Sequence, residues 1–480
     1  MDNKINDPVF YEFDRITKIP RQSHNEELIS EYLYNWAKEQ NLDVIRDNYN
    51  NIFIRVPATK GYENKDSIAL QAHMDMVCEK NPEIEHDFSK DPIEYFIDGD
   101  IVSTHNRTTL GADDGIGVAT ILALIKSDNP HPELEIIFTT DEEDDFTGAS
   151  NFNYELIKSK YLINVDHAKE DEIICSSAGG TGIKLVKKIN LKSKPEKNNF
   201  KTYRISIKGF NGGHSGEDIE KGYGNANIEL FRIINKLYIN YEVLNINGGT
   251  LRTAIPREAS IDLAFNPKDF KNVKLFLEEY KKIISDEYEY LNDNFDIDIF
   301  EIENNYNKII SYKDFEDLNK IILMLPNGIQ EMSYTFKNTV KTSINIGEVR
   351  LNKDTLEIVA EIRSLCDSET QFLIDKIEII SELFSYQCTT FSTYCAWKFK
   401  KNSKLKDIAV EIFEKIQKKK IRAIALHAGL ECSFFANVKD DIDIISIGPN
   451  CRYFHSPKEE FEFSSMQKIY RCLAELVKNI

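Results

Sequence analysis

The sequence has little positive charge, no long apolar run and no paired cysteines, and each shortage argues against a class of protein. Its 60 Lys and Arg residues stand against 79 Asp and Glu residues, which gives a net charge of −19. Such a surface repels phosphate backbones, so nucleic acid is not an expected partner. No apolar run approaches the roughly 20 residues that cross a bilayer, so a membrane is not expected as a partner either.

The N-terminal segment and the cysteines indicate a compartment. Residues 1–10 lack the basic region, apolar stretch and small-residue cleavage site of a secretion signal. The eight cysteines are scattered and form no CxxC pair, which favours reduced thiols over a disulfide framework or a thiolate zinc site. We therefore predict a cytoplasmic protein.

The length and the apolar pattern predict two domains, because 480 residues exceed what one compact core usually holds. Up to about residue 185, short apolar runs alternate with helical segments. The strand-like runs lie at residues 44–45, 52–56, 68–72, 134–139 and 161–165, and a helix is expected at 116–125. This rhythm predicts an α/β fold, a mixed sheet with helices on both faces.

Ser23 and Glu26 have the spacing of a helix capping box, and an apolar pattern of helical period follows from Leu28 to Trp36. After about residue 185 the pattern changes to alternating strands such as 203–208 and 260–264, with a long amphipathic helix near 270–290. A helix at 405–418, a buried strand at 442–447 and a helix at 464–478 then resume the first pattern. We therefore predict a catalytic domain built from residues 1–185 and 398–480, interrupted by an inserted α+β lid or dimerisation domain over residues 186–397.

Several polar groups fall at or just after the predicted strand ends, where ligand sites in α/β sheets gather. His73 follows the strand at 68–72, and a nearby carboxylate such as Asp75 could fix the orientation of a metal-binding imidazole. Taken alone, this pattern is outweighed by the alternative of a buried structural histidine. Asp166 ends the run at 161–165, and His455 follows the late strand at 442–447; either could be structural when taken singly.

Two acidic motifs allow two interpretations each. In Gly111–Gly117, the acids could cap a helix N-terminus, or Asp113 could bridge two metals; the sequence favours neither. The five acids from Asp141 to Asp145 are more often a solvated turn. However, carboxylates crowded at the end of a buried strand repel one another unless a cation is present, and one of them could serve as a base.

Considered together, these positions predict a metal site with two imidazoles and three carboxylates. Its members are His73, Asp113, Glu143, Asp166 and His455. Nitrogen and oxygen ligands without a thiolate suit a hydrolytic pair of zinc ions about 3.5 Å apart, and manganese or cobalt could replace zinc.

Seven longer stretches, in one order along the chain, resemble a known family. They are HMDMVCEKNP from His73, GADDGIGVA from Gly111, NGGHSGEDIEKGYGNAN from Asn211, NGGTLRTAIPREA from Asn247, EIRSLCDS from Glu361, HAGLEC from His427 and SIGPNCRYFHSP from Ser446. They are similar to the co-catalytic zinc exopeptidases that include carnosinases, acylases and carboxypeptidase G-type enzymes. The likeness is greatest to the bacterial aminoacyl-histidine dipeptidases, and it extends over almost the whole chain.

The resemblance implies two Zn²⁺ per chain, or Mn²⁺ or Co²⁺ as substitutes. One zinc would be bound by His73, Asp113 and Asp166, and the other by Asp113, Glu143 and His455. Glu142 would be the general base for a metal-bridged hydroxide, and Asp75 would orient His73. The family also has a cis peptide at the position of Asp113–Asp114.

The resemblance assigns further roles to residues outside the metal motifs. His214 would donate to the oxyanion, and Arg363 would bind the terminal carboxylate of the peptide. Without the resemblance, His214 would be read as part of a Gly-rich turn and Arg363 as a charge on a strand surface. His427 and Glu431 would belong to the substrate pocket, with Glu431 suited to a free amino terminus.

Two departures from the family pattern bear on metal affinity and substrate preference. The family usually has small residues after the paired glutamates, where Asp144 and Asp145 stand here. His167 follows Asp166 at a position where a small or acidic residue is more usual.

The expected function is hydrolysis of Xaa-His and other short unblocked peptides. One alternative is an N-acyl amino acid deacylase, because the same metal centre cleaves both kinds of bond. A second alternative is a non-catalytic metal- or peptide-binding protein, against which the intact Glu142 argues. A homodimer is expected; a monomer is the alternative, because the insertion is large enough for two lobes that could complete the site within one chain.

Overall fold

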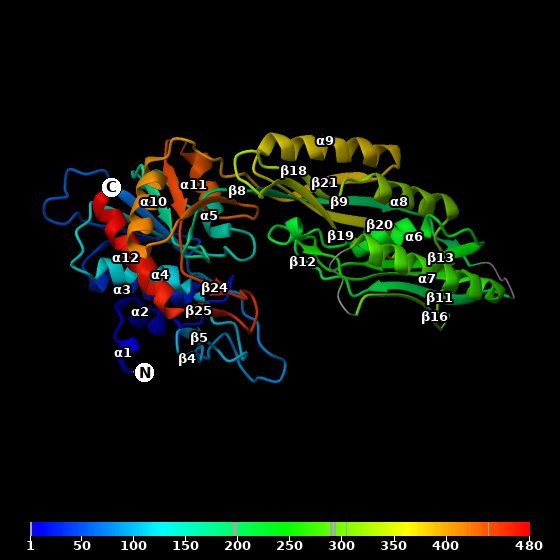
Figure 1. The fold of residues 1–480 in the computed structure, drawn as a ribbon, viewed down its shortest axis with the longest axis horizontal. Helices are drawn as coiled ribbons and strands as arrows, with labels where there is room; N and C mark the ends of the chain where they lie inside the picture. Colours follow the sequence, from blue (N-terminus) through cyan, green and yellow to red (C-terminus); the bar gives the residue numbers. More distant parts are fainter. Residues whose placement is uncertain (1, 195–198, 289–290, 292–293, 304, 440) are drawn as a thin grey trace. The chain divides into compact units, whose positions relative to one another are not determined.

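The computed structural model describes residues 2–194, 199–288, 291, 294–303, 305–439 and 441–480, and it divides the chain into two compact units (Figure 1). Unit 1 holds the residues up to Ser177 together with Trp397–Ala425 and Leu430–Ile480. Unit 2 holds Ala178–Ala396 and Leu426–Gly429. The predicted boundary at residue 186 falls inside strand β9 (Gly179–Lys188), which pairs with β20 (Thr355–Ser364) in the sheet of unit 2.

Within the described residues, the main sheet of unit 1 has eight strands in the order β1-β2-β6-β3-β7-β23-β8-β22. They are β1 (Asp43–Arg46), β2 (Ile52–Val56), β3 (Ile68–His73), β6 (Leu134–Thr139), β7 (Tyr161–Asn164), β8 (Glu172–Ser177), β22 (Arg422–Leu426) and β23 (Asp443–Ser446). Strands β6, β3, β7 and β23 run parallel, whereas β1, β2 and β6 pair antiparallel. The predicted mixed sheet is confirmed, and its central strands β3 and β6 are fully buried, as their continuous apolar runs indicate.

Helices cover both faces of this sheet, as the alternation of side chains on β2 shows. Ile52 and Ile54 join a core that includes residues of α2 (Pro8–Ile16), α3 (Glu27–Glu39), α4 (Ala112–Ile125), α10 (Lys404–Gln417) and α12 (Phe463–Asn479). Phe53, between them, packs on Phe152, which contacts Phe435 on α11 (Cys432–Val438). The short helices α1 (Asp2–Ile5) and α5 (Thr147–Asn151) also belong to unit 1.

The predicted capping box at Ser23 and Glu26 is wrong, although the helix that follows it is correct. The helix α3 begins at Glu27 without a side-chain hydrogen bond from its N-cap residue. The Ser23 hydroxyl instead donates to Asp75, and Glu26 accepts from the backbone of Asp141. Both side chains therefore form hydrogen bonds with residues distant in sequence, and neither caps the helix as the local pattern predicted.

A smaller sheet in unit 1 holds the late histidine motif. Its order is β24-β25-β5-β4, with β4 (Phe96–Asp98), β5 (Ile101–Ser103), β24 (Cys451–Arg452) and β25 (Glu460–Glu462). His455 lies in the turn between β24 and β25 and has a positive φ of 54°.

Unit 2 is built on one antiparallel sheet. Its order is β16-β11-β15-β13-β19-β20-β9-β21, with β18 paired to β19. Besides β9 and β20, its strands are β11 (Lys201–Lys208), β13 (Tyr241–Gly248), β15 (Ala259–Phe265), β16 (Asp296–Glu301), β18 (Gly328–Met332), β19 (Val340–Asn352) and β21 (Gln387–Tyr394). The pairing of β13 with β19 is limited to Asn247 with Arg350 and Gly248 with Val349. The sheet therefore consists of two halves joined by a short ladder.

The helices of unit 2 share one core with this sheet. They are α6 (Ala226–Ile234), α7 (Phe270–Glu287), α8 (Tyr312–Met324) and α9 (Asp367–Leu383). The predicted helix near 270–290 is α7, and residues 289–290 lie outside the described residues. The α+β character expected for the insertion is confirmed.

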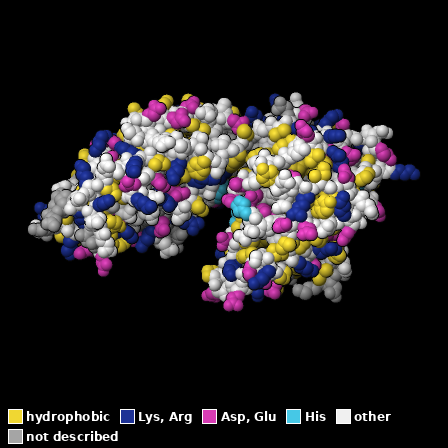
Figure 2. All heavy atoms as spheres, turned by 180° about the vertical axis from the view of Figure 1, so that it is seen from behind, with side chains coloured by type: hydrophobic (Ala, Val, Ile, Leu, Met, Phe, Trp, Pro, Cys, Tyr) yellow, Lys and Arg dark blue, Asp and Glu magenta, His cyan; other side chains and the backbone are white. Residues whose placement is uncertain are grey.

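The outer surface agrees with the composition. Figure 2 shows acidic and basic side chains interspersed over the visible face of both units. No described helix combines the length and the apolarity needed to cross a bilayer.

Candidate active site

The predicted metal ligands of unit 1 converge because they follow neighbouring strands. His73 is the last residue of β3, Glu142 and Glu143 follow β6, and Asp166 follows β7. These three strands are adjacent and parallel, so their carboxyl ends meet at one edge of the sheet. Asp113 reaches the same place from the first turn of α4, and His455 from the turn after β24.

Asp113 lies between the two histidines. Its Oδ1 is 3.1 Å from His73 Nε2, and its Oδ2 is 3.5 Å from His455 Nε2. His73 Nε2 is also 3.9 Å from Asp166 Oδ1, and His455 Nε2 is 2.8 Å from Glu143 Oε2. The donor atoms of His73, Asp113 and Asp166 all lie within 4.8 Å of one another, as do those of Asp113, Glu143 and His455.

Asp75 connects His73 to the loop after β6, which carries Glu142 and Glu143. Its Oδ1 is 3.3 Å from His73 Nδ1 and accepts a hydrogen bond from Glu142 N at 3.1 Å. Its Oδ2 accepts from Glu143 N at 3.3 Å and from Ser23 Oγ at 2.8 Å. The contact on Nδ1 leaves His73 Nε2 directed at Asp113 and Asp166, which is the arrangement that a histidine ligand requires.

The chemistry of these donors fits a pair of divalent cations. Burial raises the pKa of both Glu142 and Asp166 well above the usual values, and neighbouring carboxylates raise them further. Burial likewise raises the pKa of Glu143, whose Oε1 is buried without a hydrogen-bond partner among the described residues. Buried carboxylates at such density are stabilised by cations, and nitrogen and oxygen donors without a thiolate suit zinc, manganese or cobalt.

The Gly111–Gly117 motif shows that its two interpretations apply to different residues. Asp114 Oδ1 accepts from Gly117 N at 3.1 Å and so serves the start of the helix, whereas Asp113 joins the donor groups. The Asp113–Asp114 peptide bond is cis, as the resemblance implied.

Glu459 holds this loop and was not foreseen from the sequence. Its carboxylate accepts four backbone N–H groups, at 2.7 to 3.2 Å, from Leu110, Gly111, Ala112 and Asp113. Glu459 stands next to Glu460 in a polar segment that resembles an ordinary solvated turn. The sequence therefore gives no signal for the role of Glu459, because only the tertiary fold brings it next to residues 110–113.

The three residues that depart from the family pattern contact side chains or backbone outside the acidic residues predicted to bind metal. Asp144 Oδ2 lies 2.7 Å from His24 Nε2, and Asp145 accepts from Thr147 N at 3.0 Å. The ring of His167 lies 3.4 Å from Glu172 Oε2. None of these three side chains belongs to a donor group of the described residues.

Glu431 lies in unit 1, in a buried polar network with residues of β3 and β6. It accepts from Gln71 Nε2 at 2.5 Å and from Thr139 Oγ1 at 2.6 Å through one oxygen. Its other oxygen, Oε1, is buried without a hydrogen-bond partner among the described residues. Burial raises the pKa of Glu431 to about 7.

The other predicted substrate residues form a cluster within unit 2. Arg363 Nη2 lies 3.3 Å from His214 Nε2, and Arg363 Nη1 donates to the Tyr394 hydroxyl at 2.9 Å. His427 Nε2 lies 2.8 Å from Ser343 Oγ, and burial together with the charge of Arg363 lowers the pKa of His427 to about 3.

Backbone contacts fix this cluster. The strands β12 (Gly213–His214) and β14 (Ala254–Ile255) pair, and His214 N donates to Asp218 at 2.7 Å. Tyr394 was not predicted, because it ends the exposed edge strand β21 and no local pattern marks it. We call His214, Arg363, Tyr394 and His427 the cationic cluster, and His73, Asp113, Glu142, Glu143, Asp166 and His455 the acidic cluster.

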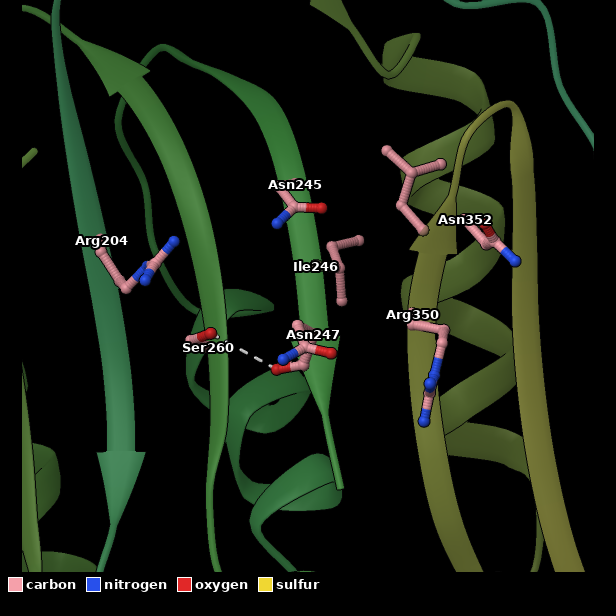
Figure 3. Close-up of a pocket in the computed structure, with 8 residues that line it drawn as sticks. Arg204, Asn245, Ile246, Asn247, Ser260, Arg350 and Asn352 are labelled. Carbon is pink, nitrogen blue, oxygen red and sulfur yellow. Dashed lines mark hydrogen bonds between the residues drawn. The ribbon is translucent and has the colours of Figure 1, made fainter. Parts of the chain in front are cut away.

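Besides the two clusters, the sheet of unit 2 has a depression of about 350 Å³, which we do not assign to catalysis (Figure 3). Arg204, Asn245, Asn247 and Arg350 surround it on β11, β13 and β19. The two arginines are paired with Asp262 and Glu348, and none of the described lining residues is a His, Cys, Asp or Glu.

Comparisons with known proteins agree with this geometry. The family described as peptidase family M20/M25/M40 matches residues 69–479. The cytosol non-specific dipeptidase of Escherichia coli (strain K12) is 35% identical over 476 residues, which cover 98% of this chain and 97% of the relative. An aminoacylhistidine dipeptidase from Vibrio alginolyticus has a similar solved structure, with a TM-score of 0.84, 33% identity, and coverage of 98% of this chain and 96% of that one. The aminopeptidase PepT from Bacillus cereus ATCC 10987, at a TM-score of 0.57 and 16% identity over 98% of this chain and 97% of that one, shares the fold.

Proposed function

Because this chain belongs to peptidase family M20/M25/M40, it is a hydrolase of peptide bonds, and we propose that it cleaves Xaa-His and other unblocked dipeptides with two zinc ions. The family membership confirms the resemblance predicted from the motifs. The observation that carries the proposal is the position of Asp113 between His73 and His455, in contact with both donor groups.

The acidic cluster would hold the cations through the sets that share Asp113. His73, Asp113 and Asp166 would bind one cation, and Asp113, Glu143 and His455 the other. A bound pair of divalent cations would polarise the scissile carbonyl and lower the pKa of a water molecule toward about 7. Asp75 would fix the tautomer and orientation of His73.

Glu142 would be the general base. It lies within the donor group formed with His73 and Glu143, and its backbone is held by Asp75. Its raised pKa gives a carboxylate that accepts a proton from water more readily than an exposed one does. In this proposal Glu142 takes that proton and then delivers it to the nitrogen of the leaving amine.

The cationic cluster would bind the charged and developing anionic parts of the substrate. Arg363 offers a guanidinium suited to the terminal carboxylate, and His214 would donate to the carbonyl oxygen as negative charge develops there. His427, neutral in the usual pH range, would line the pocket. Glu431 Oε1 would accept from the free amino terminus.

We also propose a location and an oligomeric state. Cytoplasmic location is supported by the relative that is named for the cytosol. A homodimer is our first expectation and a monomer the alternative, which sedimentation of the purified protein would distinguish.

Metal-free enzyme reloaded with Zn²⁺, Mn²⁺ or Co²⁺ and assayed on a dipeptide panel tests the proposal. We expect metal-dependent hydrolysis of Ala-His and related dipeptides, and much slower release of amino acid from N-acetylhistidine. Faster cleavage of N-acetyl amino acids would instead identify a deacylase. Absence of hydrolysis with every metal would favour the non-catalytic alternative.

A further inference from the structure

The segment between α2 and α3 contacts three of the four loops that contribute to the acidic cluster from the main sheet and α4; the loop after β7, which carries Asp166, is the fourth. Residues 21–26 touch the end of β3, the turn before α4 and the acidic loop after β6. The sequence pattern predicted none of these contacts, because Ser23 and Glu26 have the spacing of a helix capping box. Instead, the side chains of Arg21, Ser23, His24 and Glu26 make hydrogen bonds to the site loops.

Arg21 joins the first two loops through a buried guanidinium. Its Nη1 donates to Met74 O at 3.1 Å and to Asp75 O at 2.8 Å, and its Nη2 donates to Gly111 O. A Cβ atom at Gly111 or at Gly115 would overlap this guanidinium. The two glycines of the motif therefore leave room for Arg21 as well as for the tight turn.

His24 and Glu26 hold the third loop, which carries Glu142 and Glu143. His24 Nδ1 lies 2.8 Å from Asp141 Oδ2, and His24 Nε2 lies 2.7 Å from Asp144 Oδ2, so one ring bridges the residues on either side of the glutamate pair. Glu26 Oε1 accepts from Asp141 N at 3.1 Å. These contacts restrain the residues that flank the two glutamates, whereas Asp75 accepts hydrogen bonds from the backbone of the glutamates themselves.

We propose that residues 21–26 form a clamp that sets the relative positions of the three loops, with His24 as a positioning residue for the general base Glu142. The proposal rests on the function proposed above for Glu142. Catalytic groups must be held within about 0.5 Å of their working geometry, and a displacement of about 1 Å can cost about 100-fold in rate. A bridge across both flanks of the glutamate pair provides such a restraint.

The test compares His24→Asn with the matched control His105→Asn. Both histidines are about half exposed, with side chains 54% and 47% accessible, and both have a positive φ, 67° and 53°, that asparagine tolerates. His105 Nε2 also binds an aspartate, Asp98, at 2.6 Å, but its ring stacks on Phe96, away from the three loops. The shorter asparagine cannot bridge Asp141 and Asp144.

We expect His24→Asn to lower kcat at least about tenfold with KM changed less than about twofold, because the base moves while the substrate-binding groups do not. Metal content should remain at the wild-type value, and hydrogen exchange of residues 140–146 should become faster. His105→Asn should change none of these quantities. A double-mutant cycle with Asp144→Ala should be non-additive, since both changes remove the same contact.

A second variant tests the buried end of the clamp. Arg21→Lys keeps the charge but cannot reach the carbonyl groups of both loops, so we expect the affinity for Mn²⁺ to fall about tenfold in the folded variant. If this variant does not fold, the His24 measurements decide.

Wild-type kcat and exchange in His24→Asn, or additive effects with Asp144→Ala, would overturn the clamp. Inactivity of both the wild type and His105→Asn would count against the proposed function, and the exchange of residues 140–146 would then still decide the clamp.

Discussion

The acidic cluster of unit 1 and the cationic cluster of unit 2 have opposite charge requirements. The first gathers four carboxylates around two histidines, whereas the second gathers an arginine and two histidines beside a tyrosine. Burial raises the pKa of acids in the first cluster and lowers that of His427 in the second. Four carboxylates outnumber the two histidines of the acidic cluster, which favours a cation ligand there. In the cationic cluster Arg363, which lies 3.9 Å from Glu361, offers its guanidinium to an anionic ligand.

The two clusters also differ in how the fold builds them. The acidic cluster depends on parallel strand ends, which bring residues from β3, β6 and β7 to one edge of a sheet. The cationic cluster depends on an antiparallel sheet, where Arg363 near the end of β20 lies beside a short hairpin-like pair that carries His214. The two clusters therefore rest on different strand arrangements, parallel strand ends in unit 1 and antiparallel strands in unit 2.

The largest effect should follow from removing the proposed base. We expect Glu142→Ala to retain both metals and to lose about 1,000-fold in kcat, the middle of the range of about 100-fold to 10,000-fold that general base catalysis contributes. The matched control is Asp145→Ala, an exposed acid of the same loop that caps Thr147. Steady-state kinetics with metal analysis provides the measurement, and normal turnover in Glu142→Ala would refute the assigned base.

Chelation of the metals should affect unit 1 alone. At metal concentrations about 1,000-fold above the dissociation constant, bound cations stabilise the folded state by about 4 kcal/mol. We expect EDTA to reduce hydrogen-exchange protection in β3, β6 and α4, with β19 and β20 unchanged. Equal loss of protection in both units would contradict the assignment of the cations to the acidic cluster.

Substitution of Arg363 should affect binding more than turnover. We expect Arg363→Lys to raise KM about 100-fold for dipeptides with a free carboxylate, because lysine cannot replace the two-pronged guanidinium contact. For dipeptide amides, which lack the terminal carboxylate, Arg363→Lys should change KM little relative to the wild type. Arg204→Lys, on the same sheet but paired with Asp262, is the control and should leave KM unchanged. An equal loss with amides would show that Arg363 does not bind the carboxylate.

The smallest effect concerns pH and the buried His427. Its pKa is about 3 in the folded protein, below the usual value of about 6.5, so the unfolded chain binds more protons between these limits. Stability should therefore rise with pH across this window. Between pH 5 and pH 7 the wild type should gain about 2 kcal/mol more than His427→Gln does, as measured by urea unfolding. An identical pH dependence in both proteins would show that His427 is not buried in its neutral form.

Local sequence patterns could place part of the acidic cluster, because His73, Glu143 and Asp166 stand at or just after continuous apolar strands. His73 and Asp166 could be placed near one another because each stands at the end of a buried apolar run. Arg21 and Glu459 could not be found in this way, since each lies in a polar segment and meets its partners only through the tertiary fold. Ser23 and Glu26 show the opposite failure, because a valid local motif was overridden by stronger contacts with Asp75 and Asp141.

Anomalous scattering from crystals grown with Mn²⁺ would show whether two cations share Asp113. We expect two peaks about 3.5 to 4 Å apart, one beside His73 and Asp166 and one beside His455 and Glu143, both in contact with Asp113. A single peak, or two peaks of which only one contacts Asp113, would show that Asp113 does not bridge two cations.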